Sequence, residues 1–461
     1  MDEDVNVSEV LHIFRSYDVR GVYGKDVTEG VASRIGAALA GFIGTGKTVC
    51  VARDYRVSGE QLKDAFSQGA LSSGLNVVDL GIVPVPIFYN AIIAKGFDGG
   101  AMVTASHNPP EWNGFKLCKK NADSISEGEG MERLRDLFAS NPGSHSPGKL
   151  SSMGGLVDAY YGHVQGNIKI GRRLRIVLDP GNGAWSGVAK ELFGRLGCDV
   201  VEMNGQPDGN FPGRGPDPND RALEGLKKRV LAERADFGVG LDGDGDRAGF
   251  VDDKGRYIGN GSMLIAIFAK YYLKGHRDAK IVHDVPCSMA VDEVVRAAGG
   301  ETFVSKTGHT NVQRDMARES ALLGGEYSNH LFFSDNYCLD DGFYAAAKMA
   351  EVVSNGTERL SDLADSIPHY PAVPVEEIAC PDALKFRVVE AAKARLATLG
   401  FERILDIDGI KAFRDGGWVL VRASNTMPQI KINSEGREMQ TALGLFELAK
   451  GIVVEEIGKL G

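Results

Sequence analysis

The sequence predicts three related α/β domains followed by an α+β domain, and three observations support this fold class. The chain has 461 residues, which is too long for one ordinary hydrophobic core and fits three or four domains. A pattern of strand, polar turn, amphipathic helix and second strand occurs three times. The pattern changes after the proline-containing segment 368–374. Because alternating strands and helices form helix-covered sheets, we expect mixed sheets sandwiched by helices in the first three domains.

In each copy of the pattern a glycine follows the helix, which is typical of a helix end. In the first copy Ser58 precedes the helix and Gln61 follows three residues later, which predicts a capping box. The first strands are expected at residues 48–51, 175–178 and 280–284, and the second strands at 76–80, 199–203 and 301–304.

Turn-forming residues mark the expected boundaries between domains. A Gly- and Ser-rich stretch covers residues 141–155, and a polar turn covers 252–255. Beyond 368–374 we expect a helix, a strand pair turned at 415–417, a strand ending at Asn433 and a helix over 439–457. The predicted domains are 1–153, 154–255, 256–368 and 369–461.

Composition and charge limit the classes of partner. Hydrophobic residues make up 43% of the chain and charged residues 25%, as in folded globular proteins. The net charge of -10 argues against a general surface for nucleic acids or anionic membranes, although a small basic pocket is compatible with it. We expect small-molecule partners, no nucleic acid, no membrane, and a monomer or small homo-oligomer.

Cysteine spacing and apolar runs indicate the compartment. The 6 cysteines occur singly, without a C-x-x-C pair that would predict a zinc or redox site. Residues 1–10 are acidic and lack the apolar core of a signal peptide, and the longest strongly apolar run, 263–269, is too short to cross a bilayer. A cytoplasmic location is therefore expected.

The most specific local pattern is D-G-D-G-D-R at residues 242–247, directly after an expected strand at 237–241. Ligands of α/β sheets bind at the carboxyl ends of strands. Glycines between Asp242, Asp244 and Asp246 allow a tight turn in which three carboxylates converge on one hard cation. This predicts a magnesium site. Arg247 stands where a calcium-binding EF-hand loop needs glycine, which argues against that alternative.

A second candidate segment, T-A-S-H-N-P at residues 104–109, follows an expected strand at 101–103 and leads to Lys116. Ser106 is a candidate nucleophile there. Neighbouring Ser and His side chains usually diverge, so these residues alone favour a capping serine over a catalytic one.

Two further clusters carry polar side chains suited to sugar phosphates. The segment 422–426 offers one fixed cation and short hydrogen-bonding groups after a strand, which is typical of a phosphate site and equally of a polar turn. In the segment 325–330, Glu326, Ser328 and His330 alternate and would share one face of an extended chain, as hydroxyl recognition requires. His309 is a weaker candidate.

Two familiar phosphate-binding patterns are rejected by their context. Residues 41–48 match G-x-x-x-x-G-K-T, but a helix precedes them and a strand follows, the reverse of a phosphate loop. Residues 238–243 match G-x-G-x-x-G but run into the acidic turn, so no helix N-terminus is available for a pyrophosphate.

The chain resembles the α-D-phosphohexomutase superfamily over nearly its whole length. The likeness is carried, in chain order, by F-R-S-Y-D-V-R-G from Phe14, T-A-S-H-N-P, D-G-D-G-D-R, G-E-Y-S-N-H and R-A-S-N-T. The opening motif with Tyr17 is closer to the phosphomannomutase/phosphoglucomutase branch than to phosphoglucosamine mutases, which usually begin F-G-T-D-G. The resemblance implies four domains around a central cleft.

The resemblance also implies an activity and the residues that perform it. The implied enzyme is an isomerase that interconverts hexose 1-phosphate and hexose 6-phosphate, of mannose and/or glucose, with a hexose 1,6-bisphosphate as intermediate and activator. Ser106 would be the phosphoserine, and a phosphoserine oxygen would hold Mg²⁺ together with Asp242, Asp244 and Asp246. The implied catalytic residues are Ser106, Arg20, Lys116, Arg247 and His330. The implied substrate contacts are Tyr17, His309, Glu326, Ser328, Arg422, Ser424, Asn425 and Thr426.

Three departures from the family pattern affect substrate contacts. Pro286 stands where relatives often carry a basic residue, Asn329 replaces a common glycine, and Met427 replaces a common glutamate. A phosphoglucosamine mutase of the same superfamily is the nearest alternative. From other classes, a sugar phosphatase and a non-catalytic sugar-phosphate binding protein are alternatives, although phosphate binding alone explains neither the acidic turn nor the serine segment from a different domain.

Overall fold

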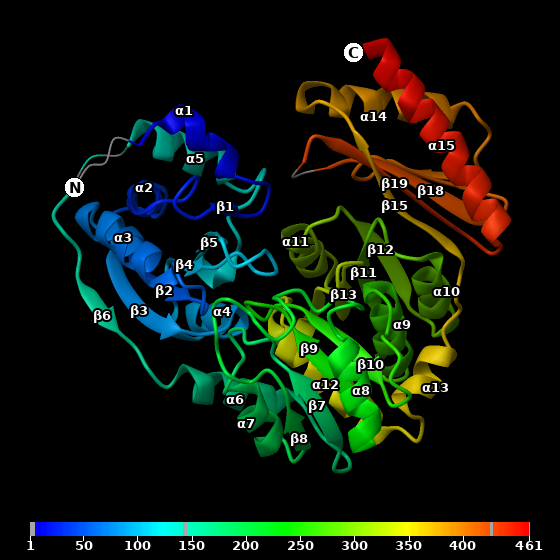
Figure 1. Cartoon of the computed structure of the whole chain (residues 1–461), viewed down its shortest axis with the longest axis horizontal. Helices are drawn as coiled ribbons and strands as arrows, with labels where there is room; N and C mark the ends of the chain where they lie inside the picture. Colours follow the sequence, from blue (N-terminus) through cyan, green and yellow to red (C-terminus); the bar gives the residue numbers. More distant parts are fainter. Residues whose placement is uncertain (1–4, 142, 144, 425–426, 461) are drawn as a thin grey trace. The chain divides into compact units, whose positions relative to one another are not determined.

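The computed structural model describes residues 5–141, 143, 145–424 and 427–460 (Figure 1). The chain divides into two compact units. The first contains Met1–Gly259 and Asn329–Ala364, and the second contains Asn260–Ser328 and Asp365–Gly461. No helix among the described residues has the length and hydropathy to cross a membrane.

The first sheet has six strands: β4, β2, β3 and β6 pair in parallel with one another, and β5 pairs antiparallel with both β4 and β1. In sheet order these are β1 (Val19–Val22), β5 (Trp112–Lys119), β4 (Gly99–Val103), β2 (Thr48–Arg53), β3 (Asn76–Ile82) and β6 (Leu150–Ser152). Around them lie α1 (Val7–Val10), η1 (Leu11–Ile13), α2 (Glu29–Ile43), α3 (Gly59–Ser72), α4 (Val85–Lys95), η2 (Lys120–Ala122) and α5 (Met131–Ser140).

Side-chain alternation along β2 places helices on both faces of this sheet. Val49 and Val51 join the core that includes residues of α2 and α3. Cys50 points to the opposite face, where a Cβ on Gly100 would meet both its Sγ and the ring of Phe88 from α4. The predicted sandwich of helices is therefore confirmed in this sheet.

Helices α2 and α3 pack closely because a glycine lies at their contact. A Cβ added to Gly69 would lie 1.8 Å from the carbonyl oxygen of Ser33, so no larger residue fits. Ser58 is the N-cap residue of α3, as predicted, but the predicted capping box is wrong. The Ser58 side chain makes no cap hydrogen bond and instead accepts one from Asn113 Nδ2 at 2.8 Å.

The second sheet also belongs to the first unit. Its strands, in the order β10, β9, β7, β8, are Ala248–Asp252, Phe237–Leu241, Arg175–Asp179 and Asp199–Glu202, with β9 and β10 antiparallel. The helices of this region are α6 (Leu156–Asn167), α7 (Ala189–Arg195) and α8 (Glu224–Glu233). β10 follows the acidic turn directly, so the G-x-G-x-x-G match opens no helix, as expected.

A later segment of the chain places a helix, α12, against the second sheet. It contains β14 (Leu331–Phe333), η3 (Ser334–Asn336), α12 (Gly342–Asn355) and α13 (Leu360–Asp365). The ring of Phe343 on α12 packs against Trp185 and Phe193, with centroids 4.9 and 4.7 Å apart. This aromatic cluster holds α12 against β9 and β10.

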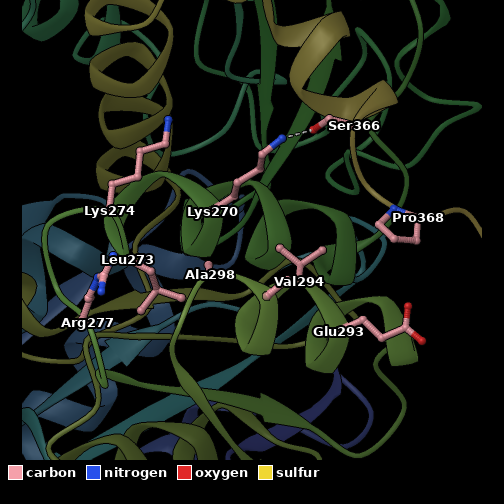
Figure 2. A pocket seen from close by; sticks show the side chains of 10 residues that line it. Lys270, Leu273, Lys274, Arg277, Glu293, Val294, Ala298, Ser366 and Pro368 are labelled. Carbon is pink, nitrogen blue, oxygen red and sulfur yellow. Dashed lines mark hydrogen bonds between the residues drawn. The ribbon is translucent and has the colours of Figure 1, made fainter.

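The second unit begins with a third parallel arrangement. β11 (Lys280–Asp284) pairs in parallel with β12 (Glu301–Ser305) and β13 (Leu323–Gly325). The helices here are α9 (Gly261–Tyr272), α10 (Met289–Ala297) and α11 (His309–Glu319). A hollow lies beside α9 and α10, and Leu273 and Val294 line part of it (Figure 2).

The last part of the second unit is an antiparallel sheet with two long helices. Its strands, in sheet order, are β15 (Ala372–Ala379), β19 (Gln429–Gly436), β18 (Gly417–Ala423), β17 (Ile410–Arg414) and β16 (Arg403–Leu405). Helices α14 (Asp382–Ala397) and α15 (Met439–Leu460) share a core with it. The predicted turn after β17 is confirmed, because Asp415 and Gly416 have φ values of 54° and 73°, as a tight hairpin requires. This is the predicted α+β domain.

Candidate active site

Ser106 lies on the turn that follows β4, and the turn holds it in an unusual conformation. Its φ is 50°, in the left-handed region that side chains rarely adopt. The side chain is buried, and its Oγ donates to Asp242 Oδ2 at 2.9 Å. The Ser106 and acidic loops, 136 residues apart in sequence, therefore meet within the first unit.

A buried arginine, Arg56, holds the Ser106 loop through hydrogen bonds to its backbone. The guanidinium of Arg56 donates to four carbonyl oxygens between 2.7 and 2.9 Å away, those of Ser106, Asn108, Pro109 and Trp112. Its Nε lies 3.3 Å from Asp54, which supplies the counter-charge. Because a guanidinium is planar and rigid, these contacts fix the curvature of the loop.

The three aspartates of the acidic turn converge as the sequence predicted. One carboxylate oxygen from each of Asp242, Asp244 and Asp246 lies within 4.8 Å of the others, and all three residues are buried. Gly245 has a φ of 86°, which permits the turn. A Cβ on Gly243 would lie 2.5 Å from the Ser106 carbonyl oxygen, so glycine is also needed for the close approach of the two loops.

The donor set of this turn fits a hard cation. Asp244 Oδ1 and Asp246 Oδ1 are buried and have no hydrogen-bond partner among the described residues. Burial, followed by the charges of Asp246 and Asp244, raises the pKa of Asp242 to about 8. Buried oxygens without partners and carboxylates that repel one another are the features that a bound cation relieves. The acidic triad can therefore bind a metal ion.

Two fixed cations adjoin these carboxylates. Lys116 Nζ lies 2.8 Å from Asp244 Oδ2 and also pairs with Asp246. Arg247 Nη2 donates to Ser106 Oγ at 2.8 Å and pairs with Asp242. Burial lowers the pKa of both cations, but the neighbouring carboxylates outweigh burial and raise the pKa of each above its usual value. Both groups therefore remain positively charged.

His107 does not form a hydrolase dyad with its neighbour. Its Nδ1 lies 3.4 Å from Ser106 Oγ, and the same nitrogen contacts Arg247 Nη2. The charge of Arg247 and burial lower the pKa of His107 well below its usual range. The two side chains thus lie closer than the sequence predicted, but the His107 nitrogen is shared between Ser106 and Arg247.

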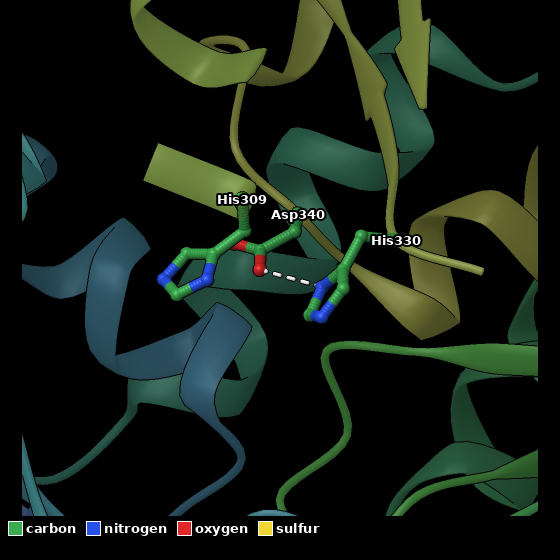
Figure 3. Close-up of side chains that lie close together, drawn as sticks. All are labelled: His309, His330 and Asp340. Carbon is green, nitrogen blue, oxygen red and sulfur yellow. Dashed lines mark ion pairs between the residues drawn. The ribbon is translucent and has the colours of Figure 1, made fainter. Parts of the chain in front are cut away.

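Arg20 and His330 are the remaining predicted catalytic residues, and both belong to the first unit. Arg20 Nη1 donates to Asn108 Oδ1 at 2.7 Å and also pairs with Asp18. His330 Nδ1 pairs with Asp340 Oδ2 at 2.9 Å (Figure 3). The same nitrogen lies 3.9 Å from Asp246 Oδ1. Burial lowers the pKa of His330, but Asp246 and Asp340 more than compensate and raise it. Tyr17 is half-buried in the same unit.

The second unit holds the predicted sugar-contacting residues. Glu326 is buried and its Oε1 accepts from Gly308 N at 2.5 Å, at the start of α11, where His309 is the first residue. Ser328 is exposed. In this unit Tyr327 N donates to Asp284 Oδ1 at 2.9 Å.

The predicted phosphate loop follows β18. Arg422, the penultimate residue of β18, pairs with Asp408 at 3.3 Å. Ser424 is buried, its Oγ accepts from Met427 N at 3.2 Å, and its carbonyl accepts from Lys385. The remaining two predicted residues of this loop, Asn425 and Thr426, lie outside the described residues.

Comparison with protein families covers most of the chain. Four family models match in order, each described for phosphoglucomutase/phosphomannomutase: alpha/beta/alpha domain I at residues 11–142, domain II at 158–255, domain III at 260–370 and the C-terminal domain at 377–447. The chain belongs to the phosphoglucomutase/phosphomannomutase family. It is thus a member of the α-D-phosphohexomutase superfamily, as the resemblance predicted.

Individual family members carry more than one name. A phosphomannomutase/phosphoglucomutase of Pseudomonas syringae pv. tomato is 34% identical over 455 residues, 97% of each chain. A probable phosphoglucosamine mutase of Methanosarcina acetivorans is 35% identical over 452 residues, 97% of this chain and all of the relative. The crystal structure of a phosphoglucomutase/phosphomannomutase family protein from Burkholderia thailandensis superposes with a TM-score of 0.89 at 32% identity, covering 97% and 98% of the two chains.

One family departure is explained by the backbone. Asn329, which the resemblance marked as a departure from glycine, has a φ of 72°. Asparagine is among the side chains that tolerate this region best. Its Nδ2 donates to the Tyr257 hydroxyl at 3.1 Å, so the amide is held within the first unit. Pro286 is buried, and Met427 is 53% exposed.

Sequence reasoning missed several residues that shape the site of this family member. Arg56 and Asp54 brace the Ser106 loop, Thr104 Oγ1 donates to Asp54 at 2.7 Å, and Asp340 pairs with His330. The available signal was D-Y-R at residues 54–56 directly after β2, because two opposite charges beside a buried strand must pair.

Proposed function

We propose that this chain interconverts hexose 1-phosphate and hexose 6-phosphate, of mannose and/or glucose, by way of a phosphoserine at Ser106 and a hexose 1,6-bisphosphate intermediate. The observation that carries the proposal is the surroundings of Ser106 Oγ, which contacts Asp242 at 2.9 Å and Arg247 at 2.8 Å. A nucleophilic oxygen placed between a carboxylate cluster and a fixed cation suits phosphoryl transfer, where positioning and charge neutralisation supply most of the catalysis.

Asp242, Asp244, Asp246 and an oxygen of phosphorylated Ser106 would hold Mg²⁺. When bound, this ion supplies positive charge to the phosphoryl oxygens. The partnerless oxygens of Asp244 and Asp246 support this assignment. Hexose 1,6-bisphosphate would also act as an activator, because it can phosphorylate Ser106 in molecules that have lost the group.

The cations of the first unit would contact the phosphoryl group that moves. Arg247 already donates to Ser106 Oγ, and Arg20 holds Asn108 of the same loop. Lys116 and His330 are the candidates for the proton exchange at the sugar hydroxyl, and Lys116, being positively charged, would return a proton rather than take one. Their carboxylate partners, Asp244 and Asp340, support these roles because each orients its cation or imidazole.

The second unit would bind the sugar and the phosphate that does not react. Glu326 and Ser328 would form hydrogen bonds with hydroxyls, and His309 would contact the same substrate. Tyr17, which belongs to the first unit, is a further proposed substrate contact. The guanidinium of Arg422, together with Ser424, Asn425 and Thr426, would bind the non-reacting phosphate as a charge-assisted site. We also propose a cytoplasmic monomer or small homo-oligomer that acts on small hexose phosphates.

The names of some relatives support a second candidate function. Because some carry the name probable phosphoglucosamine mutase at similar identity, a hexosamine phosphate is the alternative substrate. A sugar phosphatase is the alternative from another reaction class, since it would use similar metal and phosphate contacts.

One assay separates these functions. Purified protein is given glucose 1-phosphate, mannose 1-phosphate or glucosamine 1-phosphate with Mg²⁺ and a trace of the bisphosphate, and both 6-phosphate and inorganic phosphate are measured. We expect 6-phosphate from glucose and mannose, with inorganic phosphate below about one-hundredth of it, because a mutase site must protect its phosphoserine from water. Net release of phosphate would show a phosphatase, and turnover of glucosamine phosphate alone would show the hexosamine enzyme.

Replacing the nucleophile tests the proposed phosphoserine. We expect Ser106→Ala to lower isomerisation by at least about a thousandfold while the melting temperature stays near the parent value. Ser67→Ala is the matched control, because this buried serine on α3 donates only to the Lys63 carbonyl. Peptide mapping of the parent should place one phosphoryl group on Ser106. Phosphate on another residue, together with an active alanine variant, would contradict the assignment.

A further inference from the structure

A basic surface in the second unit takes no part in the proposed chemistry. Lys270 in the last turn of α9 and Lys274 and Arg277 just beyond it line one hollow of about 710 Å³ (Figure 2). α9 ends at Tyr272, and the non-helical segment that follows it brings Lys274 and Arg277 to the same hollow as Lys270 and Leu273.

These cations lack carboxylate partners. Lys270 donates to the Ser366 hydroxyl at 2.8 Å, and neither Lys274 nor Arg277 has an ion-pair partner among the described residues. The one carboxylate in the lining, Glu293, is already engaged, because Arg437 pairs with it and the Tyr370 hydroxyl donates to it, both at 2.5 Å. The hollow therefore carries a local charge of about +3 in a chain whose net charge is -10.

Between the charges the lining is apolar. Leu273 and Val294 lie between Lys274 and Arg277 on one side and Glu293 and Pro368 on the other, and Lys270 points toward Ser366 (Figure 2). Leu273 is 1% exposed, so the half-buried side chains of Val294 and Pro368 provide the accessible apolar surface. A volume of this size is typical of sites for small organic ligands, which are mostly apolar with a few convergent polar groups.

The favourable interaction of cations with a helix C-terminus explains only part of this arrangement. That interaction stabilises a positive charge within the last turn of the helix, as at Lys270. Lys274 and Arg277 lie beyond the last turn of α9, which ends at Tyr272, and line the same hollow as the apolar residues. The ligand chemistry that matches both features is an anion attached to an apolar body.

We propose that this hollow is a second binding site, separate from Ser106, for an organic phosphate or carboxylate with an apolar part. The anionic group contacts the basic side chains of Lys270, Lys274 and Arg277, and the apolar part lies on Val294 and Pro368. Ser366 and Pro368 belong to the segment between α13 and β15, so the ligand also holds the connection to the C-terminal sheet. Binding in this hollow does not depend on the reaction at Ser106.

Binding of 1-naphthyl phosphate to the full chain tests the proposal. Equilibrium dialysis is performed in the presence of saturating, pre-equilibrated glucose 1-phosphate and 6-phosphate, which occupy any other phosphate site. We expect inorganic phosphate and 1-naphthol each to bind at least about tenfold more weakly, because each offers only half of the complementary chemistry. No binding of 1-naphthyl phosphate, or equal binding of inorganic phosphate, would overturn the proposal.

Matched variants identify the site. The combined change Lys270→Gln, Lys274→Gln and Arg277→Gln should weaken 1-naphthyl phosphate binding by at least about tenfold. The control combination Lys280→Gln, Arg296→Gln and Arg314→Gln removes the same charge from the same unit outside the hollow and should change binding less than about threefold. An equal effect of both combinations would show general electrostatic attraction and overturn the proposal. Val294→Asp provides a second variant, expected to weaken binding by placing a carboxylate on the apolar lining.

Discussion

Arg56 is a buried residue that controls the geometry of the proposed nucleophile, Ser106, without contacting the Ser106 side chain. Its guanidinium contacts four carbonyls of the Ser106 loop, and no catalytic atom depends on it directly. The strained φ of Ser106 must be maintained by surrounding contacts, because left-handed backbone costs free energy for a side-chain-bearing residue. Arg56 is therefore a positioning residue for the proposed reaction.

Arg56→Lys tests this role. A lysine keeps the charge but cannot contact four carbonyls in one plane, so we expect kcat to fall about 10- to 100-fold while KM changes less than about threefold. Arg53→Ala is the control, because Arg53 ends the same strand and contacts only the Asp54 carbonyl and Glu60. A parallel fall in melting temperature and in the amount of folded protein, with unchanged kcat per folded molecule, would show a purely structural role.

Asp341 is a titrating residue whose position is structural. It is the N-cap of α12, where Oδ1 accepts from Tyr344 N at 2.8 Å and Oδ2 accepts from the Tyr160 hydroxyl at 2.6 Å and from Asn336 Nδ2 at 3.2 Å. Burial raises its pKa to about 7, and the charge of Asp340 adds to that effect. The folded protein thus binds a proton more tightly than the unfolded chain.

The sign of the pH dependence follows from this difference. Since the folded pKa lies above the ordinary value of 3.8, the stabilisation from protonated Asp341 is present below that value and is lost as the pH rises through about 7. The free energy of unfolding should therefore decrease between pH 4 and 7. Asp341→Asn cannot ionise and keeps an acceptor for Tyr344 N, so the melting temperature of the variant relative to the parent should rise from pH 5 to pH 8. A difference that is constant with pH would contradict the shifted pKa.

At the scale of elements, the repeated strand and helix pattern was predictable because its signals are local. Apolar runs, polar turns and helix-ending glycines lie within a few residues of one another, and β2, β3, β7, β8, β11 and β12 begin at the predicted residues. The contacts that fix α3 and α12 are distant in sequence. Ser58 bonds to Asn113 rather than to its own helix, and Phe343 packs on Trp185 of an earlier segment. No local pattern carries such pairings.

The residues of the candidate site also fall into two groups, those with a local sequence signal and those that depend on contacts distant in sequence. The acidic turn was predictable because three alternating carboxylates suggest one ligand by themselves, whereas Ser106 needed its tertiary contact with Asp242 to stand out from a capping serine. The roles of the individual residues stay predictions, including those of the loop after β18.

The element β18 leads to a test of the proposed phosphate contact. We expect Arg422→Ala to raise the KM for hexose phosphates at least about tenfold, because a guanidinium contact to phosphate is charge-assisted. Phosphorylation of Ser106 by the bisphosphate should be affected less, since Ser106 and its cations belong to the first unit. Arg403→Ala on the neighbouring sheet edge is the control, as Arg403 stacks only on Phe413. An unchanged KM in the Arg422 variant would refute the assignment.

At the scale of the whole molecule, the chain has a negative net charge but contains local clusters of positive side chains. The net charge of -10 repels anions, yet Lys116 and Arg247 stay positive beside buried carboxylates and the hollow beside α9 carries three cations. Local fields of this kind select small anions without attracting extended polyanions. This distribution of charge fits a protein that acts on sugar phosphates. It also agrees with the expectation from the net charge that the partners are small molecules.

The prediction of substrate range concerns Glu326 and Ser328, which would contact the sugar hydroxyls. The resemblance to the family branch implies that they contact the 3- and 4-hydroxyls, which glucose and mannose share. The two sugars differ in configuration at carbon 2. A site without a dedicated polar group at that carbon leaves no buried group unpaired when the epimer binds, so discrimination stays small.

We therefore predict specificity constants for glucose 1-phosphate and mannose 1-phosphate within about a hundredfold of each other, with glucosamine 1-phosphate poorer because it adds an ammonium group. Asn329 is the residue that could alter this outcome. Its Nδ2 donates to Tyr257, whereas its buried Oδ1 has no hydrogen-bond partner among the described residues and could accept from a sugar hydroxyl. If the amide only fills its own position, Asn329→Gly should change the ratio of the two specificity constants less than about threefold, since glycine adopts the same φ. A strong preference for one epimer in the parent that disappears in the glycine variant would show that Oδ1 distinguishes carbon 2, and the expectation of dual use would be wrong.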